Sequence, residues 1–599
     1  MAADVSKNIF KLNILNRVFS LTQPYKKKFY FSIVLSVFLA ILSPIRPLLI
    51  QFTINKGIIG TQAAWLIKGP GAFLIEITII QIVLLLVETI ARLLFTFTSA
   101  SLGQSVVRDL RNQTYSKIIH LNLSQFDKTP IGTLTTRTIN DIESVNDIFS
   151  DGLIPIITDF LSIVSVLIYM FYADWRITLI CLIPFPLLII ATFIFKESVK
   201  KSFTKVRNAV AALNAFVQEH ISGMSVIQIF AAEKREAEKF QSINKEHRNA
   251  NIKAIFAYSV FFPIVELVSA ASIGLLVWWA AQRSFSMPAN EAGHLAGVIT
   301  SFILCLGLLF RPLRIIADKF NVLQMGMIAS ERVFKILDIN EPTPFDARHH
   351  KEINALQGTI EYKNVSFSYE ESQPVLKNIS FKVPAGKTLA IVGNTGSGKS
   401  TITSLLNRLY PISNGEILID GCSIEEIEIT FLRSQIAVVL QDVFLFTGTV
   451  MDNITLRNPA IQKEEVINAA KMIGIHDFVM QLPGDYNFNI LERGAALSVG
   501  QRQLLSFARA LLYNPSILIL DEATSSIDSE SEVLIQKAIN KLIAGRTCIV
   551  IAHRLSTIRK ADNILVLERG EMAEMGNHGE LMVKKGRYFE LLNKQFSGE

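Results

Sequence analysis

Six apolar runs, each long enough to cross a lipid bilayer, constrain this chain more than any other feature of its sequence. They lie at 29–54, 72–100, 153–173, 177–195, 255–281 and 294–316. A helix needs about 20 apolar residues to span the hydrocarbon core, where every backbone hydrogen bond must be satisfied internally. Hydrophobic residues make up 50% of the chain and charged residues 19%, which excludes an ordinary soluble protein. The N-terminal half therefore predicts an α-helical membrane domain with six transmembrane helices.

The basic residues of this half gather in three segments. Lys26, Lys27 and Lys28 precede the first run, and the segments 108–150 and 196–253 are rich in lysine and arginine. By the positive-inside rule these segments face the cytoplasm, together with the N-terminus. The formal charge of +7 then marks an inner membrane surface and membrane lipids, not nucleic acid. An even number of spans returns the chain to the cytoplasm.

The two long basic segments keep a helical alternation, so we expect them to continue the spanning helices beyond the membrane. Turn residues interrupt them at 127–132 and 222–224, where a short turn could contact a partner domain. Loops that only cover the surface are the alternative.

The chain changes character in its second half. A polar stretch with Pro342 and Pro344 predicts a linker, and from Gly358 onward strands alternate with helices, as in an α/β domain with a largely parallel sheet. We expect four parts: an N-terminal segment at 1–24, a transmembrane domain at 25–325, a linker at 326–357 and the α/β domain at 358–599.

The second half contains a phosphate-binding loop. The pattern G-x-x-x-x-G-K-[ST] is filled between a buried strand at 388–392 and a helix from 401. Its backbone N–H groups and the helix N-terminus would face an anion, Lys399 would reach the β- and γ-phosphates, and Ser400 would bind Mg²⁺. The alternative is a glycine-rich turn that matches by chance. The expected ATP-binding residues are Gly393, Asn394, Thr395, Gly396, Ser397, Gly398, Lys399, Ser400 and Thr401.

A second strand at 516–520 ends in Asp521 and Glu522. Ligands of parallel sheets gather at the carboxyl ends of the strands, so we expect Asp521 to hold Mg²⁺ through water and Glu522 to orient the attacking water. A pair of acids that caps the next helix is the alternative.

Between these motifs, Leu497-Ser498-Val499-Gly500-Gln501 resembles the signature of the ATP-binding cassette (ABC) transporter family. The resemblance spans the chain and implies a P-loop NTPase domain in which Ser498, Gly500 and Gln501 contact the nucleotide of a second domain. The usual signature is Leu-Ser-Gly-Gly-Gln, so Val499 is a departure. A β-branched side chain fits poorly where φ is positive or a phosphate approaches closely, which predicts weaker support for hydrolysis.

The same resemblance implies roles for further residues. Tyr369 would stack on adenine, Gln441 would contact Mg²⁺ and act in catalysis, and Asp528 would communicate between paired nucleotide domains. His553 would contact the γ-phosphate as a catalytic residue beside Glu522. The alternatives are that Tyr369 is only a tyrosine at a strand edge and that His553 has a structural role.

A further loop, Glu492-Arg493-Gly494, resembles the one that meets the membrane helices in exporters. A solvated charge pair is the alternative reading.

With one set of motifs and about six spans, the chain resembles a half-transporter that must pair with a second half-transporter. The resemblance implies ATP- and Mg²⁺-dependent export of an amphipathic small molecule or lipid across a bacterial cytoplasmic membrane. Homodimer and heterodimer both remain open. A membrane-anchored ATPase that senses or regulates without moving solute is the alternative function, and an importer is a third.

Charged residues within or near the spans are functional candidates by default, and five occur here. Glu88 and Arg92 stand one helical turn apart, so we expect them to neutralise each other. Asp159 and Glu266 have no local partner in the sequence and are predicted to be cavity acids for a cationic or zwitterionic substrate. Arg46 completes the set.

Overall fold

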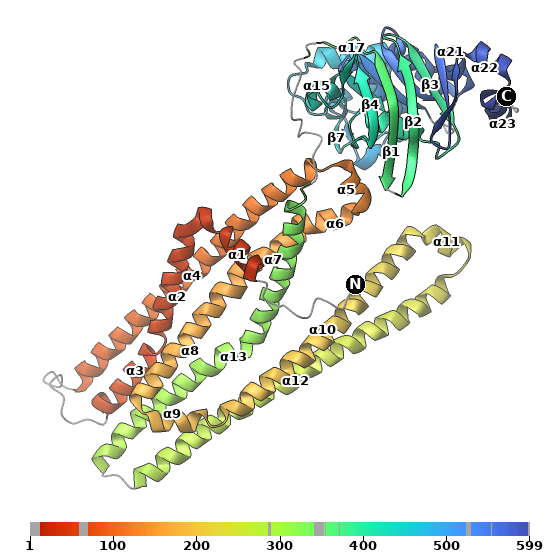
Figure 1. The fold of residues 1–599 in the computed structure, drawn as a ribbon. Coiled ribbons are helices and arrows are strands. Elements are labelled where there is room, and N and C mark those ends of the chain that lie inside the picture. Colours follow the sequence, from red (N-terminus) through yellow and green to blue (C-terminus); the bar gives the residue numbers. More distant parts are fainter. Residues whose placement is uncertain are drawn as a thin grey trace. The chain divides into compact units, whose positions relative to one another are not determined.

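A computed structural model describes residues 12–58, 70–285, 289–340, 353, 355–370, 372–522, 529–552 and 554–596. The chain forms two compact units (Figure 1). Residues 1–118 and 132–339 make up the first, which we call the membrane unit. Residues 119–131 and 340–599 make up the second, which we call the nucleotide unit.

The described part of the membrane unit is entirely helical. Six of its helical segments are long and apolar enough to cross a membrane, as predicted: Gln23–Lys56, Ala72–Ile119, Ile131–Ala173, Trp175–Ser222, Glu233–Phe285 and Leu295–Leu313. Its helices are α1 (Leu12–Ser20), α2 (Lys26–Leu42), α3 (Ile45–Phe52), α4 (Pro70–Ile119), α6 (Ile131–Thr136), α7 (Ile142–Asp147), α8 (Leu153–Ala173), α9 (Trp175–Leu182), α10 (Phe185–Ser222), α11 (Met224–Ile229), α12 (Glu233–Phe285) and α13 (Ala289–Leu337), with short turns η1 (Gln23–Tyr25), η2 (Thr53–Ile58), η4 (Arg137–Asp141) and η5 (Ile148–Gly152).

Polar caps separate consecutive helices. Asp174 ends α8 and begins α9, where its carboxylate accepts hydrogen bonds from the backbone N–H groups of Arg176 (2.8 Å) and Ile177 (3.2 Å). These bonds satisfy two of the N–H groups that every helix start leaves without an internal partner. A chain reversal within an apolar stretch is thereby possible.

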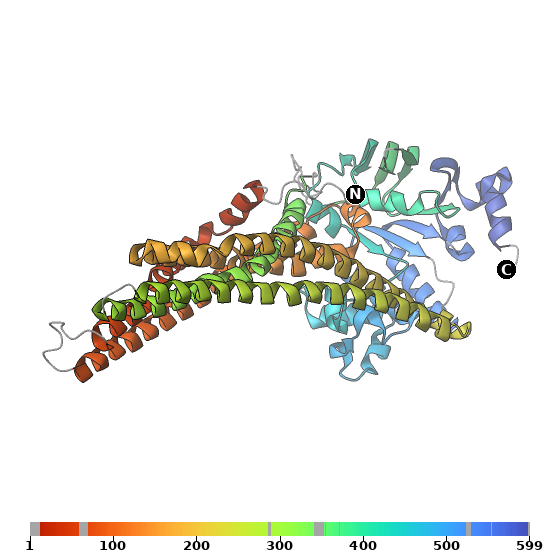
Figure 2. The ribbon, with the colours of Figure 1, turned by 90° about the horizontal axis from the view of Figure 1, so that it is seen from below.

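Helices α10 and α12 form a long hairpin whose tip is the short helix α11. Both helices extend far beyond their apolar parts, as the alternation predicted, and the predicted break at Gly223 separates α10 from α11. The rings of Phe195 and Phe261 stack across the hairpin with centroids 4.0 Å apart. Figure 2 shows the two helices side by side from a second direction.

Helix α13 runs to Leu337, so the first twelve residues of the predicted linker, 326–337, are helical. At its end Asp338 receives hydrogen bonds from the guanidinium of Arg17 at 2.6 and 2.7 Å, and that guanidinium lies 4.1 Å from the centre of the Phe334 ring. These contacts pack α1 against the end of α13.

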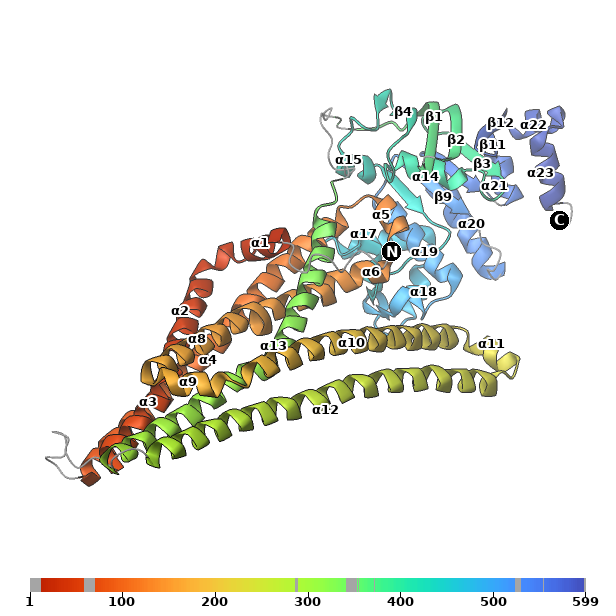
Figure 3. The ribbon, with the colours of Figure 1, turned by 60° about the horizontal axis from the view of Figure 1, so that its bottom comes forward.

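The nucleotide unit contains a six-stranded sheet (Figure 3). Five neighbouring strands run parallel and β12 pairs antiparallel at one edge, which confirms the predicted α/β class. The strand order is β12 (Glu571–Gly576), β11 (Asn563–Glu568), β3 (Thr388–Gly393), β10 (Thr547–Ala552), β9 (Ile517–Glu522) and β6 (Ile436–Val439). The central strands are almost wholly buried, as expected of a parallel sheet covered on both faces.

The unit also holds two smaller sheets that the sequence reading did not separate. One is antiparallel, in the order β2 (Gln373–Val383), β1 (Ile360–Glu370), β4 (Asn414–Ile419) and β5 (Cys422–Ser423), and the other pairs β7 (Gly448–Thr449) with β8 (Asn489–Ile490). The helices of the unit are α5 (Leu123–Lys128), α14 (Lys399–Leu406), α15 (Ile429–Ser434), α16 (Val450–Thr455), α17 (Lys463–Ile473), α18 (His476–Met480), α19 (Val499–Leu512), α20 (Ser529–Ile543), α21 (Leu555–Lys560), α22 (His578–Lys584) and α23 (Arg587–Phe596), with turns η6 (Asp485–Asn487) and η7 (Glu492–Gly494).

Candidate functional site

The register of the parallel sheet brings the predicted site segments to one edge. Ile551 of β10 pairs with Ile391 of β3 on one side and with Asp521 of β9 on the other. Gly393, two positions after Ile391, ends β3 just beyond the level of Asp521. Val439 of β6 aligns with Leu520, which puts Gln441 just beyond the same edge. Carboxyl ends of parallel strands form the usual ligand edge of such folds.

The phosphate-binding loop depends on two glycines. Gly393 has φ 156° and Gly398 has φ 103°. A Cβ atom on Gly393 would lie 2.4 Å from the carbonyl oxygen of Leu567, and one on Gly398 would lie 2.6 Å from Cδ2 of Leu376. Any other residue would push the loop out of its place against β11 and β2.

Lys399 is 92% buried, at 8% exposure, and its ammonium group closes the loop from inside. Its Nζ donates to the carbonyl oxygens of Gly393 (2.8 Å) and Asn394 (3.0 Å). Burial lowers the pKa of this ammonium group, and the nearby Asp521 carboxylate partly offsets that effect. A buried ammonium group that donates to two neutral carbonyls gains strongly from an anionic ligand.

The loop fits a phosphate chain on two further observations. The Ser397 hydroxyl oxygen is buried and has no hydrogen-bond partner in the part of the chain that the structure describes. Gly396, with φ 80°, has open space where a Cβ atom would stand. A buried unsatisfied hydroxyl beside an open glycine loop at a helix N-terminus is a cradle for an anion.

Three oxygen donors lie in the segments that meet here. They are the hydroxyl of Ser400, which is exposed at the start of α14, the amide of the exposed Gln441 and the carboxylate of Asp521. Hard oxygen donors of this kind suit Mg²⁺, which keeps several of its waters and takes few protein ligands. The donor set therefore fits the ion.

The structure does not describe the side chains of three predicted residues. Asp528 and His553 lie outside the described residues, and for Glu522 the structure describes the backbone, which ends β9, but not the side chain. Their predicted roles remain predictions.

Tyr369 stands at the end of β1 over the start of α14. Its hydroxyl lies 3.2 Å from the hydroxyl of Thr401, and its ring is 45% exposed. Ring edges of Phe367 and Tyr410 support it, at centroid distances of 4.8 and 5.1 Å. An exposed, supported ring beside a phosphate loop can stack on a base.

Tyr410 is a residue that the sequence reading missed. Its hydroxyl donates to Oδ2 of Asp127 in α5 at 2.6 Å, and burial together with this hydrogen bond raises the pKa of the phenol. Asp127 belongs to the turn that was predicted to contact a partner domain, and the segment 119–131 that holds it is part of the nucleotide unit. No local signal could have identified Tyr410, because 283 positions separate it from Asp127.

The signature segment forms the N-terminus of α19. Ser498 caps the helix: its hydroxyl accepts from the backbone N–H of Gln501 (3.2 Å), and the Gln501 side chain accepts from the backbone N–H of Ser498 (2.9 Å). This is a complete capping box, which leaves the exposed helix start free to face an anion.

Val499 lies in the first turn of α19, is 46% exposed and is not among the described residues with positive φ. The expectation that a positive φ is required at this position is therefore wrong. A valine meets the helical geometry without strain, and only its side-chain bulk distinguishes it from glycine here.

The loop Glu492-Arg493-Gly494 is a short 3₁₀ turn. Arg493 has φ 55° and Gly494 φ 74°, and a Cβ atom on Gly494 would lie 2.7 Å from Cδ of Arg502. Arg502 in turn donates to the Gly494 carbonyl at 3.3 Å. The turn is thus fastened to α19, directly beside the signature.

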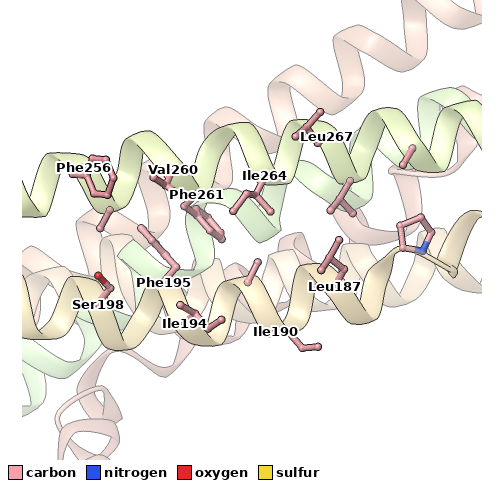
Figure 4. Close-up of a pocket in the computed structure, with 15 residues that line it drawn as sticks. Leu187, Ile190, Ile194, Phe195, Ser198, Phe256, Val260, Phe261, Ile264 and Leu267 are labelled. Atoms are coloured by element: carbon pink, nitrogen blue, oxygen red, sulfur yellow. The ribbon is translucent and has the colours of Figure 1, made fainter.

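Two cavities of the membrane unit differ in their chemistry. The first, an apolar groove of about 630 Å³, lies between α10 and α12, and Ser198 is the one polar side chain among its described lining residues (Figure 4). The second, which we call the polar cavity, has about 550 Å³ and is lined by residues of α2, α3, α4, η5, α8 and α13.

Two sequence predictions about membrane charges are decided here. Arg92 Nη2 lies 2.9 Å from Oε1 of Glu88, which confirms their mutual neutralisation. Asp159 lines the polar cavity, as predicted for a cavity acid, but Lys319 of α13 forms an ion pair with its carboxylate. The sequence could not reveal this partner, which is 160 positions away. Glu266 is not among the described lining residues of either cavity.

Fold and site together define a class of protein: a phosphate-loop ATPase fused to a six-span membrane domain. Comparison with known proteins agrees. The family described as ABC transporter transmembrane region matches residues 29–311, and the family described as ABC transporter matches residues 376–525.

Individual relatives cover most of the chain. An uncharacterized ABC transporter ATP-binding protein of Bacillus subtilis is 40% identical over 83% of this chain and 81% of its own length. An ATP-dependent lipid A-core flippase of Syntrophus aciditrophicus is 36% identical over 83% and 81%. A Staphylococcus aureus relative, named as a multidrug export ATP-binding/permease protein, is 34% identical over 97% and 100%.

The chain belongs to the ABC transporter family. It is a multi-pass integral membrane protein, an ATPase coupled to transport and an ATP-driven exporter, with transmembrane and ATP-binding regions fused in one half-transporter that dimerises.

Proposed function

We propose that two copies of this chain form a homodimer that exports an amphipathic small molecule or lipid across a bacterial cytoplasmic membrane. The observation that carries this proposal is the single half-site: one phosphate loop at Gly393–Ser400 and one signature at Ser498, fused to six spans. In this family a nucleotide is held between the loop of one domain and the signature of another.

The structure of the signature favours a homodimer over a heterodimer. Heterodimeric members of this family often keep one full site and one weakened site, which would suit a distorted signature. Here the capping box of Ser498 and Gln501 is complete, and Val499 takes helical geometry. In a homodimer, two identical signatures of this kind would each complete the nucleotide site at the phosphate loop of the other chain.

The chain's own residues would perform the chemistry as follows. Lys399 exchanges its two carbonyl contacts for phosphate oxygens, and Ser397 gains the partner that its buried hydroxyl lacks. Tyr369 presents its exposed ring to the adenine. Glu522 orients the attacking water and His553 contacts the γ-phosphate, while Asp528 communicates with the second domain.

Ser400, Gln441 and Asp521 would hold Mg²⁺, which neutralises charge that develops on the phosphates during transfer. The exposed positions of Ser400 and Gln441 leave room for the waters that this ion retains.

The membrane and nucleotide parts would be coupled through α5. Its Asp127 is held by Tyr410, whose ring also supports Tyr369. A shift of Tyr369 on ATP binding would thus reach α5 through one intermediate side chain. The turn at Gly223, at the tip of the α10–α12 hairpin, is proposed to transmit the motion as well.

The nucleotide unit and the N-terminus are proposed to face the cytoplasm, because the three basic segments flank the spans on that side. Closure of the dimer by ATP would then open the membrane domain outward, and hydrolysis would reset it.

The test is ATP-driven accumulation of fluorescent amphiphiles in inside-out vesicles that contain the purified chain. We expect flux with the native protein, loss of flux in Glu522→Gln, and normal flux in Glu464→Gln, a matched change on the exposed face of α17. Robust ATPase activity with no flux of any compound would support the sensor instead. Copurification of a distinct half-transporter in stoichiometric amount would exclude the homodimer.

A further inference from the structure

The polar cavity carries more positive than negative charge. Four cationic side chains line it, Arg46, Arg92, Arg311 and Lys319, against three acids, Glu88, Asp151 and Asp159, which leaves a net charge of 4 − 3 = +1. Charges at membrane depth are expensive and mark substrate pathways by default.

Ion pairing removes four of these seven charges. Arg92 pairs with Glu88 at 2.9 Å, and Lys319 pairs with Asp159. Among the described residues, no carboxylate lies within ion-pairing distance of Arg46 on α3 or Arg311 on α13. The two arginines come from helices that pack against each other, and both line the polar cavity.

The remaining acid is partly satisfied. Oδ2 of Asp151 accepts a hydrogen bond from the hydroxyl of Ser150 at 3.1 Å. The charge left without a partner in the polar cavity is therefore two guanidinium groups against one carboxylate, so this cavity selects against a cationic guest.

The rest of the lining is divided between hydroxyl groups and apolar side chains. Thr96 and Ser162 can donate to an anion, while Phe95, Leu304 and Leu308 offer apolar surface. A volume of about 550 Å³ falls within the range of about 300–1,000 Å³ typical of small-molecule sites. Guanidinium groups bind phosphate and carboxylate through paired hydrogen bonds.

The geometry points to an anionic amphiphile as the substrate class: Arg46 and Arg311 bind its phosphate or carboxylate head group in the polar cavity, and the apolar lining takes the start of its tail. This inference rests on the proposed export function, and it replaces the cationic or zwitterionic substrate that the sequence indicated. The apolar groove between α10 and α12 has no charged lining residue among those described and cannot distinguish head groups.

The test measures equilibrium binding without ATP, using the full-length dimer in nanodiscs of neutral lipid. Four fluorescent probes with matched short tails serve as ligands: phosphatidylglycerol, a fatty acid, phosphatidylcholine and a quaternary ammonium amphiphile. The first two distinguish a phosphate from a carboxylate head group. We expect one or both anions to bind at least about tenfold more tightly than the other probes, as suits two charge-assisted contacts.

Variants assign that preference to the two arginines. In Arg46→Gln/Arg311→Gln the preference for the anionic probes should fall to within about twofold. In the double lysine variant the preference should be kept in part, because the positive charge survives. In Arg46→Glu/Arg311→Glu the cationic probe should become the preferred ligand. Arg176→Gln, an exposed cation outside the polar cavity, leaves binding as in the native protein. A reversed preference cannot arise from misfolding.

Equal binding of all four probes, or an anion preference that survives the Gln/Gln change, would overturn the inference. Loss of dimerisation in the Gln/Gln variant would also overturn it, because the arginines would then serve the interface between protomers. Each of these results is independent of ATP-driven flux, so a failure of the export function would appear as absent flux with arginine-dependent binding intact.

Discussion

The hydroxyl group of Tyr410 donates to Oδ2 of Asp127 at 2.6 Å, across 283 positions of sequence. Tyr410 follows the phosphate-loop helix, and Asp127 lies in the short helix α5 between two membrane-spanning segments. The Tyr410 ring also meets the edge of Tyr369, the candidate adenine platform, at 5.1 Å. One side chain therefore contacts both the candidate nucleotide site and the segment that leads to the membrane helices.

Removal of this hydroxyl should uncouple transport from hydrolysis. In Tyr410→Phe the ring contact with Tyr369 survives, so basal ATPase activity should stay within about twofold. Transport per ATP should fall at least roughly fivefold, because a hydrogen bond to a charged acceptor contributes about 1.5–3 kcal/mol. The measurement is the ratio of flux to phosphate release in proteoliposomes.

Tyr513→Phe is the matched control for this change. Tyr513 also donates a 2.8 Å hydrogen bond inside the nucleotide unit, to the carbonyl of Thr455, but it does not contact α5. It should leave the coupling ratio unchanged. Equal ratios for native protein and Tyr410→Phe would contradict the coupling role of Tyr410.

Local patterns predicted the six spans, the long helices, the parallel sheet and the residues of the phosphate loop, because each depends on neighbouring residues. Long-range partners could not be predicted this way. The Asp127–Tyr410 and Asp159–Lys319 pairs exist only after distant segments pack together, and the second one neutralises a predicted cavity acid. The error at Val499 has a different cause: the backbone geometry was inferred from the glycine of other signatures, whereas the capping box at Ser498 sets it here.

The Ser498 cap should matter for both stability and hydrolysis. Ser498→Ala removes the hydroxyl that accepts from the Gln501 N–H, and loss of such a cap lowers stability by about 1 kcal/mol. It also removes a polar group from the anion-facing helix start, so ATPase activity should fall at least about tenfold.

Asn577→Ala separates these two effects. Asn577 caps α22 with a capping box of the same kind, accepting from the Glu580 N–H at 2.9 Å. It should lower stability by a similar amount with little loss of ATPase activity. Equal activity losses in the two variants would mean that Ser498 acts only as a helix cap.

Replacing Val499 with the glycine that is usual in this signature should change ATPase activity and stability only slightly. Val499 is already helical, so Val499→Gly should alter ATPase activity by less than about threefold and reduce stability by up to about 1 kcal/mol. The measurements are maximal phosphate release and thermal unfolding of the purified dimer. A tenfold rise in activity would show that the valine side chain weakens the site, which would favour a heterodimer.

Acidification should loosen the C-terminal helices. His578 is the first residue of α22, and its Nδ1 lies 2.7 Å from the hydroxyl of Tyr588 in α23. Burial first, and the Arg559 cation second, lower the pKa of His578 below its usual 6.5. The unfolded chain therefore binds a proton more readily, so stability is present above pH 6.5 and is lost as pH falls toward the lowered pKa.

Hydrogen exchange of α22 and α23 between pH 7.5 and 5.5 measures this effect, after correction for the intrinsic pH dependence of exchange. Protection should decrease with acidification in the native protein and decrease less in His578→Gln, which cannot gain the charge. The same decrease in both proteins would contradict the role of His578.

The most direct measurement for the central claim is the initial rate of ATP-driven amphiphile uptake into inside-out proteoliposomes that contain this chain and no other half-transporter. The account predicts uptake that requires ATP, stops in Glu522→Gln and persists in Glu464→Gln. ATP hydrolysis without uptake of any anionic, zwitterionic or cationic probe would contradict it.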